Sequence, residues 1–142
     1  MAEGVWEQLV ETYLAIDRGC FLNPQYIVEG PEKWRAEPDF LAVNFPDNEV
    51  WMVEVTKAPY GLKGKISEFE KDYIPKIREQ LIRHRVIRDI DADPKWTFGF
   101  WIFTIEKEKS WVEGALSAAC IATSRVTALE EIAFPKWEMR YR

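Results

Sequence analysis

Two acidic residues interrupt an otherwise apolar stretch in the first half of the chain, "EPDFLAVNFPDNEVWMVEVTKAP" (residues 37–59). Asp39 opens one apolar run, and Glu54 lies near the end of the next. An ionised carboxylate among apolar neighbours is costly unless it is protonated, paired or bound to a cation. Carboxylate oxygens suit Mg²⁺ or Mn²⁺, and such an ion polarises phosphoryl oxygens and activates water. The two residues therefore predict a metal site for hydrolysing a phosphodiester bond.

The elements that carry these residues must bring them together. The runs at residues 39–45 and 49–55 are strand-like, and the turn sequence "PDN" separates them, which predicts a β-hairpin. Pairing of the two strands would place Asp39 and Glu54 side by side, within reach of one ion.

The rest of the chain predicts helices on both sides of this hairpin. A Ser67-x-x-Glu70 capping box is expected to start a helix after the hairpin, and Pro75 to kink or divide it. The other expected elements are a helix over residues 4–18 ended by Gly19, a strand over 25–30, a buried central strand over 96–105 and a helix over 111–132. The order αβββαβα predicts an α/β fold with a mixed central sheet flanked by helices, in one domain spanning residues 1–142.

Pro38-Asp39, followed fifteen residues later by Glu54 in "VEVTK", resembles the PD-(D/E)XK nuclease superfamily of restriction enzymes, Holliday-junction resolvases and repair nucleases. The resemblance extends over roughly residues 4–105, because that family's core is also helix, three strands, helix, strand. It implies a restriction-endonuclease-like fold and a Mg²⁺-dependent endo- or exodeoxyribonuclease, with Asp39 and Glu54 as metal ligands. Family members often place a Glu on the first helix, where Glu7 is the better match, as a ligand or water-positioning group, and Glu11 the second.

The chain departs from this family at the lysine position. The family places Lys two residues after its second acidic residue, where this chain has Thr56, and the lysine follows one residue later as Lys57. Strand alternation turns Lys57 away from Glu54 unless a bulge rotates it back. Lys57 is nevertheless our candidate for stabilising the charge that builds at phosphorus. The alternatives are recruitment of Lys63, Lys65 or Lys71, or a catalytically inactive relative that binds nucleic acid or protein.

Charge is distributed unevenly along the chain. The net charge is −5, which argues against a protein that coats DNA through bulk positive charge. Residues 62–88 hold eight basic and four acidic side chains, a net +4, so the remainder carries −9. This segment is expected to contact DNA phosphates. Gln80 resembles a polar helix residue found near the site in some family members, and the expected nucleic-acid-binding residues are Lys63, Lys65, Lys71, Lys76, Gln80 and Arg83.

The remaining features bear on the compartment, the partners and the alternative chemistries of the protein. Cys20 and Cys120 are far apart, without metal-ligand or redox spacing, and are expected to be buried reduced thiols. The acidic start resembles no signal peptide, and no window is apolar enough for a membrane span, so a cytoplasmic protein without a membrane partner is expected. The lone His84 supports no catalytic triad, and "DIDADP" fails as a calcium loop because Pro94 replaces the required Gly. The small size leaves no room for a sequence-reading module, so a homodimer or a larger assembly is expected.

Overall fold

The computed structural model describes residues 4–24, 26–29, 35–88 and 95–133. Its centre is a five-stranded mixed sheet in the spatial order β1-β4-β5-β6-β7. The strands are β1 (Phe21–Pro24), β4 (Phe40–Asn44), β5 (Glu49–Val55), β6 (Thr97–Thr104) and β7 (Ser124–Ala128). Strands β1, β4 and β5 are antiparallel neighbours, whereas β6 and β7 run parallel to β5.

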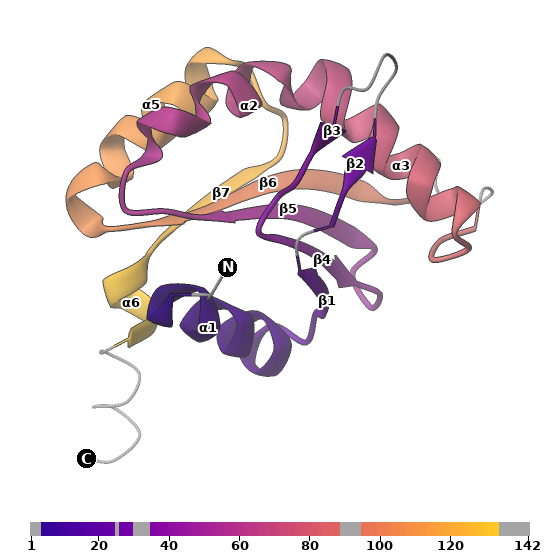
Figure 1. Ribbon diagram of the computed structural model, residues 1–142, viewed down its shortest axis with the longest axis horizontal. Coiled ribbons are helices and arrows are strands. Elements are labelled where there is room, and N and C mark those ends of the chain that lie inside the picture. The colour runs from indigo at the N-terminus through magenta and orange to yellow at the C-terminus, as the bar shows by residue number, and fades with distance from the viewer. Residues whose placement is uncertain (1–3, 25, 30–34, 89–94, 134–142) are drawn as a thin grey trace.

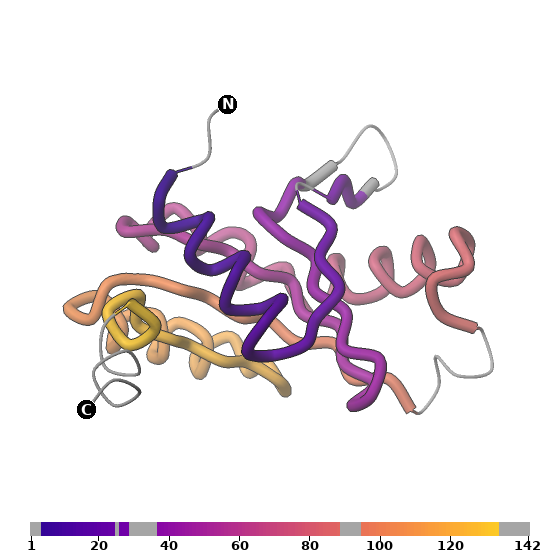
Figure 2. The backbone as a smooth tube through the Cα atoms, turned by 90° about the horizontal axis from the view of Figure 1, so that it is seen from below, coloured from indigo at the N-terminus to yellow at the C-terminus, as the bar shows by residue number. Residues whose placement is uncertain are grey.

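Helices cover both faces of this sheet (Figure 1), so the expected α/β fold with a mixed, helix-flanked sheet is confirmed. One face carries α1 (Val5–Thr12), its π-helical continuation (Tyr13–Asp17) and α6 (Leu129–Ala133). The other face carries α2 (Lys63–Glu68), α3 (Ile74–Arg83) and α5 (Lys109–Ala118). Figure 2, seen from the side of α1, shows this helix lying across the strands.

Strand alternation divides the core into two clusters, one on each face. On β5, Val50 and Met52 pack beneath α2, α3 and α5, whereas Trp51 and Val53 pack against α1. Period-two alternation therefore assigns Glu54 to the face of Val50 and Met52. Both faces of the strand are apolar because both are covered, which is typical of a central strand with parallel neighbours.

The segment between β5 and β6 is helical in three pieces. A 3-10 turn (Pro59–Leu62) leads into α2, a π-helical turn (Phe69–Tyr73) follows, and Pro75 lies at the start of α3. The predicted division of this helix near Pro75 is confirmed. The predicted start at Ser67 is wrong, because α2 begins at Lys63 and the Ser67 hydroxyl donates to the Gly64 carbonyl inside the helix (2.9 Å).

Three further predictions require correction. Residues 111–132 do not form one helix, since α5 ends at Ala118 and β7 and α6 follow. Within the predicted strand 25–30, β2 (Val28–Glu29) pairs with β3 (Arg35–Ala36) in a separate two-stranded sheet, while residues 25 and 30 lie outside the described part of the chain. The first strand of the main sheet, β1, was not predicted. Cys20 is buried as expected, but Cys120 is exposed.

Two glycines have a clear structural reason. Gly19 follows the first helical segment with φ +66°, the left-handed conformation that favours glycine, as predicted. Gly99 lies beneath Trp51, because a Cβ at this position would meet ring atoms Cζ3 and Cε3 at 2.4 and 2.7 Å. Glycine at residue 99 therefore allows the indole of Trp51 to approach the β6 backbone closely.

Candidate active site

The hairpin of β4 and β5 brings the two predicted carboxylates together. Phe40 pairs with Val53 in the antiparallel register, and continuing that register by one residue places Asp39 opposite Glu54. Both side chains belong to the sheet face covered by α2 and α3, and the Asp39 carboxylate lies close enough to Glu54 to raise its pKa. The pair therefore forms where β4 begins and β5 ends.

The Asp39 side chain also accepts a backbone hydrogen bond at the end of β5. Its Oδ2 accepts a hydrogen bond from the Val55 backbone N–H at 2.8 Å. That bond fixes the Asp39 carboxylate against β5, because Val55 is the last residue of the strand. Asp39 remains half-buried, so part of this carboxylate stays within reach of solvent.

The charge partner of Glu54 comes from the helical layer. Lys65 of α2 places its Nζ 2.7 Å from Glu54 Oε2. The Glu54 side chain is 7% exposed and that of Lys65 is 28% exposed, so the ion pair joins a buried anion to a cation that still reaches water. An ammonium group therefore lies beside the carboxylate pair.

Burial dominates the protonation of Glu54. Desolvation raises its pKa from 4.5 to about 7, the attraction of Lys65 opposes this increase, and the Asp39 carboxylate adds to it. Tyr73 lies nearby on the π-helical turn, and burial, followed by Glu68, Glu54 and Asp72, raises the pKa of its hydroxyl to about 12. At neutral pH the site thus combines a carboxyl group near its midpoint with a phenol that keeps its proton.

The structure places the other predicted catalytic residues apart from this pair. Glu7 lies on α1, the helix that covers the opposite face of the sheet. Lys57 is exposed, two residues beyond the end of β5. Thr56, at the family's lysine position, accepts a hydrogen bond from the Ala58 N–H at 3.0 Å. The ammonium beside Glu54 is thus supplied by Lys65, which the sequence offered only as one of three alternatives.

The predicted nucleic-acid-binding residues fall into two groups. Gln80 is buried, and its amide donates to the Tyr26 hydroxyl at 3.2 Å and to the Ile27 carbonyl at 2.9 Å. The other positions besides Lys65 are more accessible: Lys63, Lys71 and Arg83 are exposed and Lys76 is half-buried. Gln80 therefore ties α3 to the segment before β2, while the basic side chains face solvent.

One buried polar residue on the sheet face of Glu54 was not identified from the sequence. Thr104 ends β6 and is fully buried, and within the described residues its hydroxyl has no hydrogen-bond partner. It follows Ile102, the register partner of Glu54, by two residues, so both strands present a polar side chain at the same end of the same face. The only signal in the sequence is the polar residue near the end of the apolar run "WIFTI".

The site offers two carboxylates, those of Asp39 and Glu54, to a hard cation. In the part of the chain that the structure describes, no group of three or more acidic, histidine or cysteine side chains is arranged to hold a metal ion. Two adjacent carboxylates remain, and Mg²⁺ commonly uses one or two carboxylates together with several waters. Asp39 and Glu54 are therefore the residues that could hold such an ion.

Among the described residues, no helix has the length and apolar character needed to cross a membrane. Comparison of the chain with protein-family models, with curated proteins and with solved structures found no match, so the function has to be inferred from the site itself.

Proposed function

We propose that this chain is a metal-dependent nuclease that hydrolyses phosphodiester bonds in DNA, on a restriction-endonuclease-like fold. The observation that carries the proposal is the meeting of two carboxylates and one ammonium group, those of Asp39, Glu54 and Lys65, at the end of β5. The chain order of helix, antiparallel strands, helical segment and parallel strand supports the fold.

Asp39 and Glu54 would hold Mg²⁺ or Mn²⁺ between adjacent strands. When bound, the ion supplies polarisation of a phosphoryl oxygen and a lower pKa for its water. A carboxylate must be ionised to bind a cation, and the Glu54 pKa is raised to about 7. Cation binding is therefore expected to strengthen as the pH rises through about 7.

Lys65 is the chain's own cation in this site. Its ammonium neutralises Glu54 in the absence of another cation and, being partly exposed, can turn toward a phosphate. There it would stabilise negative charge that develops at phosphorus, the role the sequence gave to Lys57. Exposed Lys63 and Lys71, on α2 and the π-helical turn, would contact the flanking phosphates.

Cleavage of plasmid, linear and branched DNA in Mg²⁺, Mn²⁺ or EDTA tests this proposal. Wild-type protein is expected to cut at least one form in the presence of metal and none in EDTA. Glu54→Gln keeps the shape of the side chain and removes its charge, so it should abolish cleavage. Cleavage that persists in this variant would show that the activity belongs to a contaminant or to another site.

A second candidate is a catalytically inactive module that binds DNA. It is favoured by the fact that both carboxylates already have partners, the Lys65 ammonium at 2.7 Å and the Val55 N–H at 2.8 Å. Calorimetric titration with Mn²⁺ separates the candidates. A nuclease should bind the ion in the wild type and lose it in Glu54→Gln, whereas a module should bind DNA in EDTA and show no binding of Mn²⁺.

A further inference from the structure

The last residue of β6, Thr104, buries a hydroxyl group that is not used in the fold. Thr104 is 0% exposed, and in the part of the chain that the structure describes its Oγ1 neither donates nor accepts a hydrogen bond. Leaving a buried hydroxyl unpaired destabilises a folded protein, and native proteins retain few such groups. The hydroxyl of Thr104 therefore requires a functional explanation.

Strand register places this hydroxyl beside the carboxylate site. Glu54 pairs with Ile102 across β5 and β6. The Thr56 N–H donates to the Phe103 carbonyl at 3.0 Å, so the parallel pairing continues past the end of β5. Thr104 is thus the diagonal neighbour of Glu54 on the same face of the sheet. Diagonal neighbours lie about 7–8 Å apart, with their Cβ atoms somewhat closer, a gap that a glutamate side chain can span.

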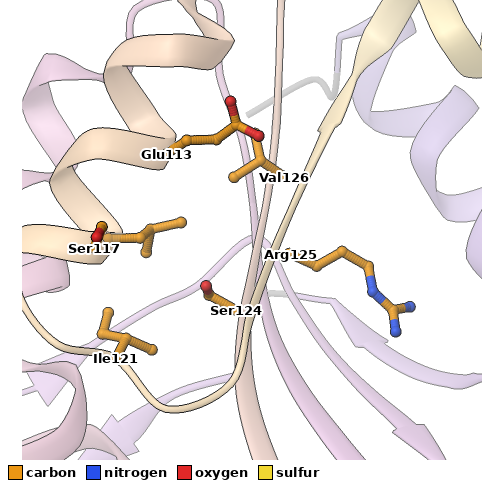
Figure 3. A pocket seen from close by; sticks show the side chains of 7 residues that line it. Glu113, Ser117, Ile121, Ser124, Arg125 and Val126 are labelled. Carbon is orange, nitrogen blue, oxygen red and sulfur yellow. The ribbon is translucent and has the colours of Figure 1, made fainter.

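The other strand neighbours of Thr104 that the structure describes offer it no side-chain partner. Ala128, its register partner on β7, has no polar side chain. Arg125 belongs to the opposite face, and Figure 3 shows its side chain on the other side of β7 from Val126. The hydroxyl oxygen of Thr56 already accepts a backbone N–H at 3.0 Å. Glu54 is therefore the neighbour to which the Thr104 hydroxyl can donate.

Lys65 directs the Glu54 carboxylate toward the helical layer. Its Nζ lies 2.7 Å from Glu54 Oε2, and because the Lys65 side chain is 28% exposed it can turn into solvent. A metal ion on Glu54 would compete with this ammonium for the same carboxylate. Once Lys65 turns away, a buried ionised carboxylate still needs a hydrogen-bond donor. Thr104 can supply one from the flank of β6.

We infer that Thr104 is a positioning residue of the carboxylate site, whose hydroxyl donates to Glu54 while that carboxylate holds a cation. Exchange of Lys65 for Thr104 keeps the carboxylate hydrogen-bonded and leaves the ammonium free for a phosphate. Groups that hydrogen-bond a metal-binding carboxylate orient it, and their loss commonly weakens metal binding by about 10- to 100-fold. The cation in this inference rests on the proposed function, to which Thr104 adds a further residue.

Calorimetric titration of the full chain with Mn²⁺ tests the role of Thr104 in cation binding. Thr104→Val keeps the shape of the side chain and removes the hydroxyl, so the affinity should fall about 10- to 100-fold. Thr104→Ser retains the hydroxyl and should restore most of the affinity. Thr97→Val, at the exposed start of β6, is the matched control and should bind as the wild type does. Wild-type affinity in Thr104→Val, together with lost binding in Glu54→Gln, would overturn the inference and leave the proposed function standing.

A double-mutant cycle in urea without metal tests whether the hydroxyl reaches Glu54. In the wild type, where Lys65 holds the carboxylate, Thr104→Val should leave the urea midpoint unchanged or raise it, because the hydroxyl is unpaired. In the Lys65→Met background the carboxyl can turn to Thr104, so the same substitution should lower the midpoint. Equal shifts in the two backgrounds, or a lower midpoint in the wild type, would overturn the inference. Failure of the wild type to bind Mn²⁺ would refute the proposed function, whereas coupling in the cycle would still support the contact of Thr104 with Glu54.

Discussion

Glu54→Gln should stabilise the folded protein at neutral and alkaline pH, because ionisation of the wild-type carboxyl is unfavourable at its buried position. Burial raises the pKa of Glu54 from 4.5 to about 7 in spite of the Lys65 ammonium. The difference between these values corresponds to roughly 3 kcal/mol of preference of the folded state for the protonated carboxyl. Glutamine has nearly the same shape and cannot ionise, so it imitates the protonated form at every pH.

The sign follows from which state loses its proton first. Below about pH 4.5, Glu54 is protonated in both the folded and the unfolded chain, and its contribution is constant. As the pH rises, the unfolded chain releases the proton while the folded protein keeps it, so the free energy of unfolding of the wild type falls. The fall is complete above about pH 7, where both states are ionised. The free energy of unfolding of Glu54→Gln minus that of the wild type should therefore increase by roughly 3 kcal/mol across this window.

Urea unfolding of both proteins, followed by tryptophan fluorescence at a series of pH values spanning this window, measures the difference. Subtracting the two curves removes titrating groups that both proteins share. Glu79→Gln, an exposed position on α3, is the matched control and should give a flat difference. A flat difference for Glu54→Gln as well, or one that falls with pH, would refute the reasoning, since Lys65 would then balance or outweigh desolvation.

Three further predictions use the same protein. Lys65→Met should slow DNA cleavage by about 100-fold or more, whereas Lys57→Met should leave it nearly unchanged; equal losses in a cleavage assay would contradict the assignment. Gly99→Ala should lower the free energy of unfolding by about 1–3 kcal/mol because its Cβ overlaps an indole ring, while Gly114→Ala, in open space on α5, should raise it by up to about 1 kcal/mol. Urea unfolding measures both changes in the free energy of unfolding, and equal effects of the two substitutions would argue against the ring contact. Gln80→Leu should lower the free energy of unfolding by about 1–3 kcal/mol, since the half-buried Ile27 carbonyl loses its donor; unchanged stability would show that this bond contributes little.

The sequence predicted the parts of the fold whose signals are local. The β4–β5 hairpin, the buried strand β6 and the end of the first helix at Gly19 rest on alternation, apolar runs and a glycine, and all three are confirmed. The end of α5 lacked such a signal, because Cys120 rather than glycine takes the left-handed conformation there, with φ +57°. The small residues that follow continue the helical pattern, which is why β7 was predicted as helix.

The site was predictable only where strand pairing determines it. Asp39 and Glu54 face each other because the hairpin register sets them opposite. The contact of Lys65 with Glu54 depends on how α2 packs over the sheet, which residue spacing along the chain does not reveal. Likewise, the burial of Gln80 follows from the position of Tyr26 and Ile27, more than fifty residues earlier in the chain.

The indoles of Trp51 and Trp101 give the protein an optical signature of its own. Their ring centroids are 5.3 Å apart with planes inclined at 64°, close and tilted enough for the electronic transitions of the two rings to couple. Such coupling splits the far-ultraviolet circular dichroism band into a pair of opposite sign, which vanishes when the rings separate. Because both rings lie on the α1 face of the sheet, this doublet reports on that half of the core without a label and without direct contact with the ionisable pair on the other side.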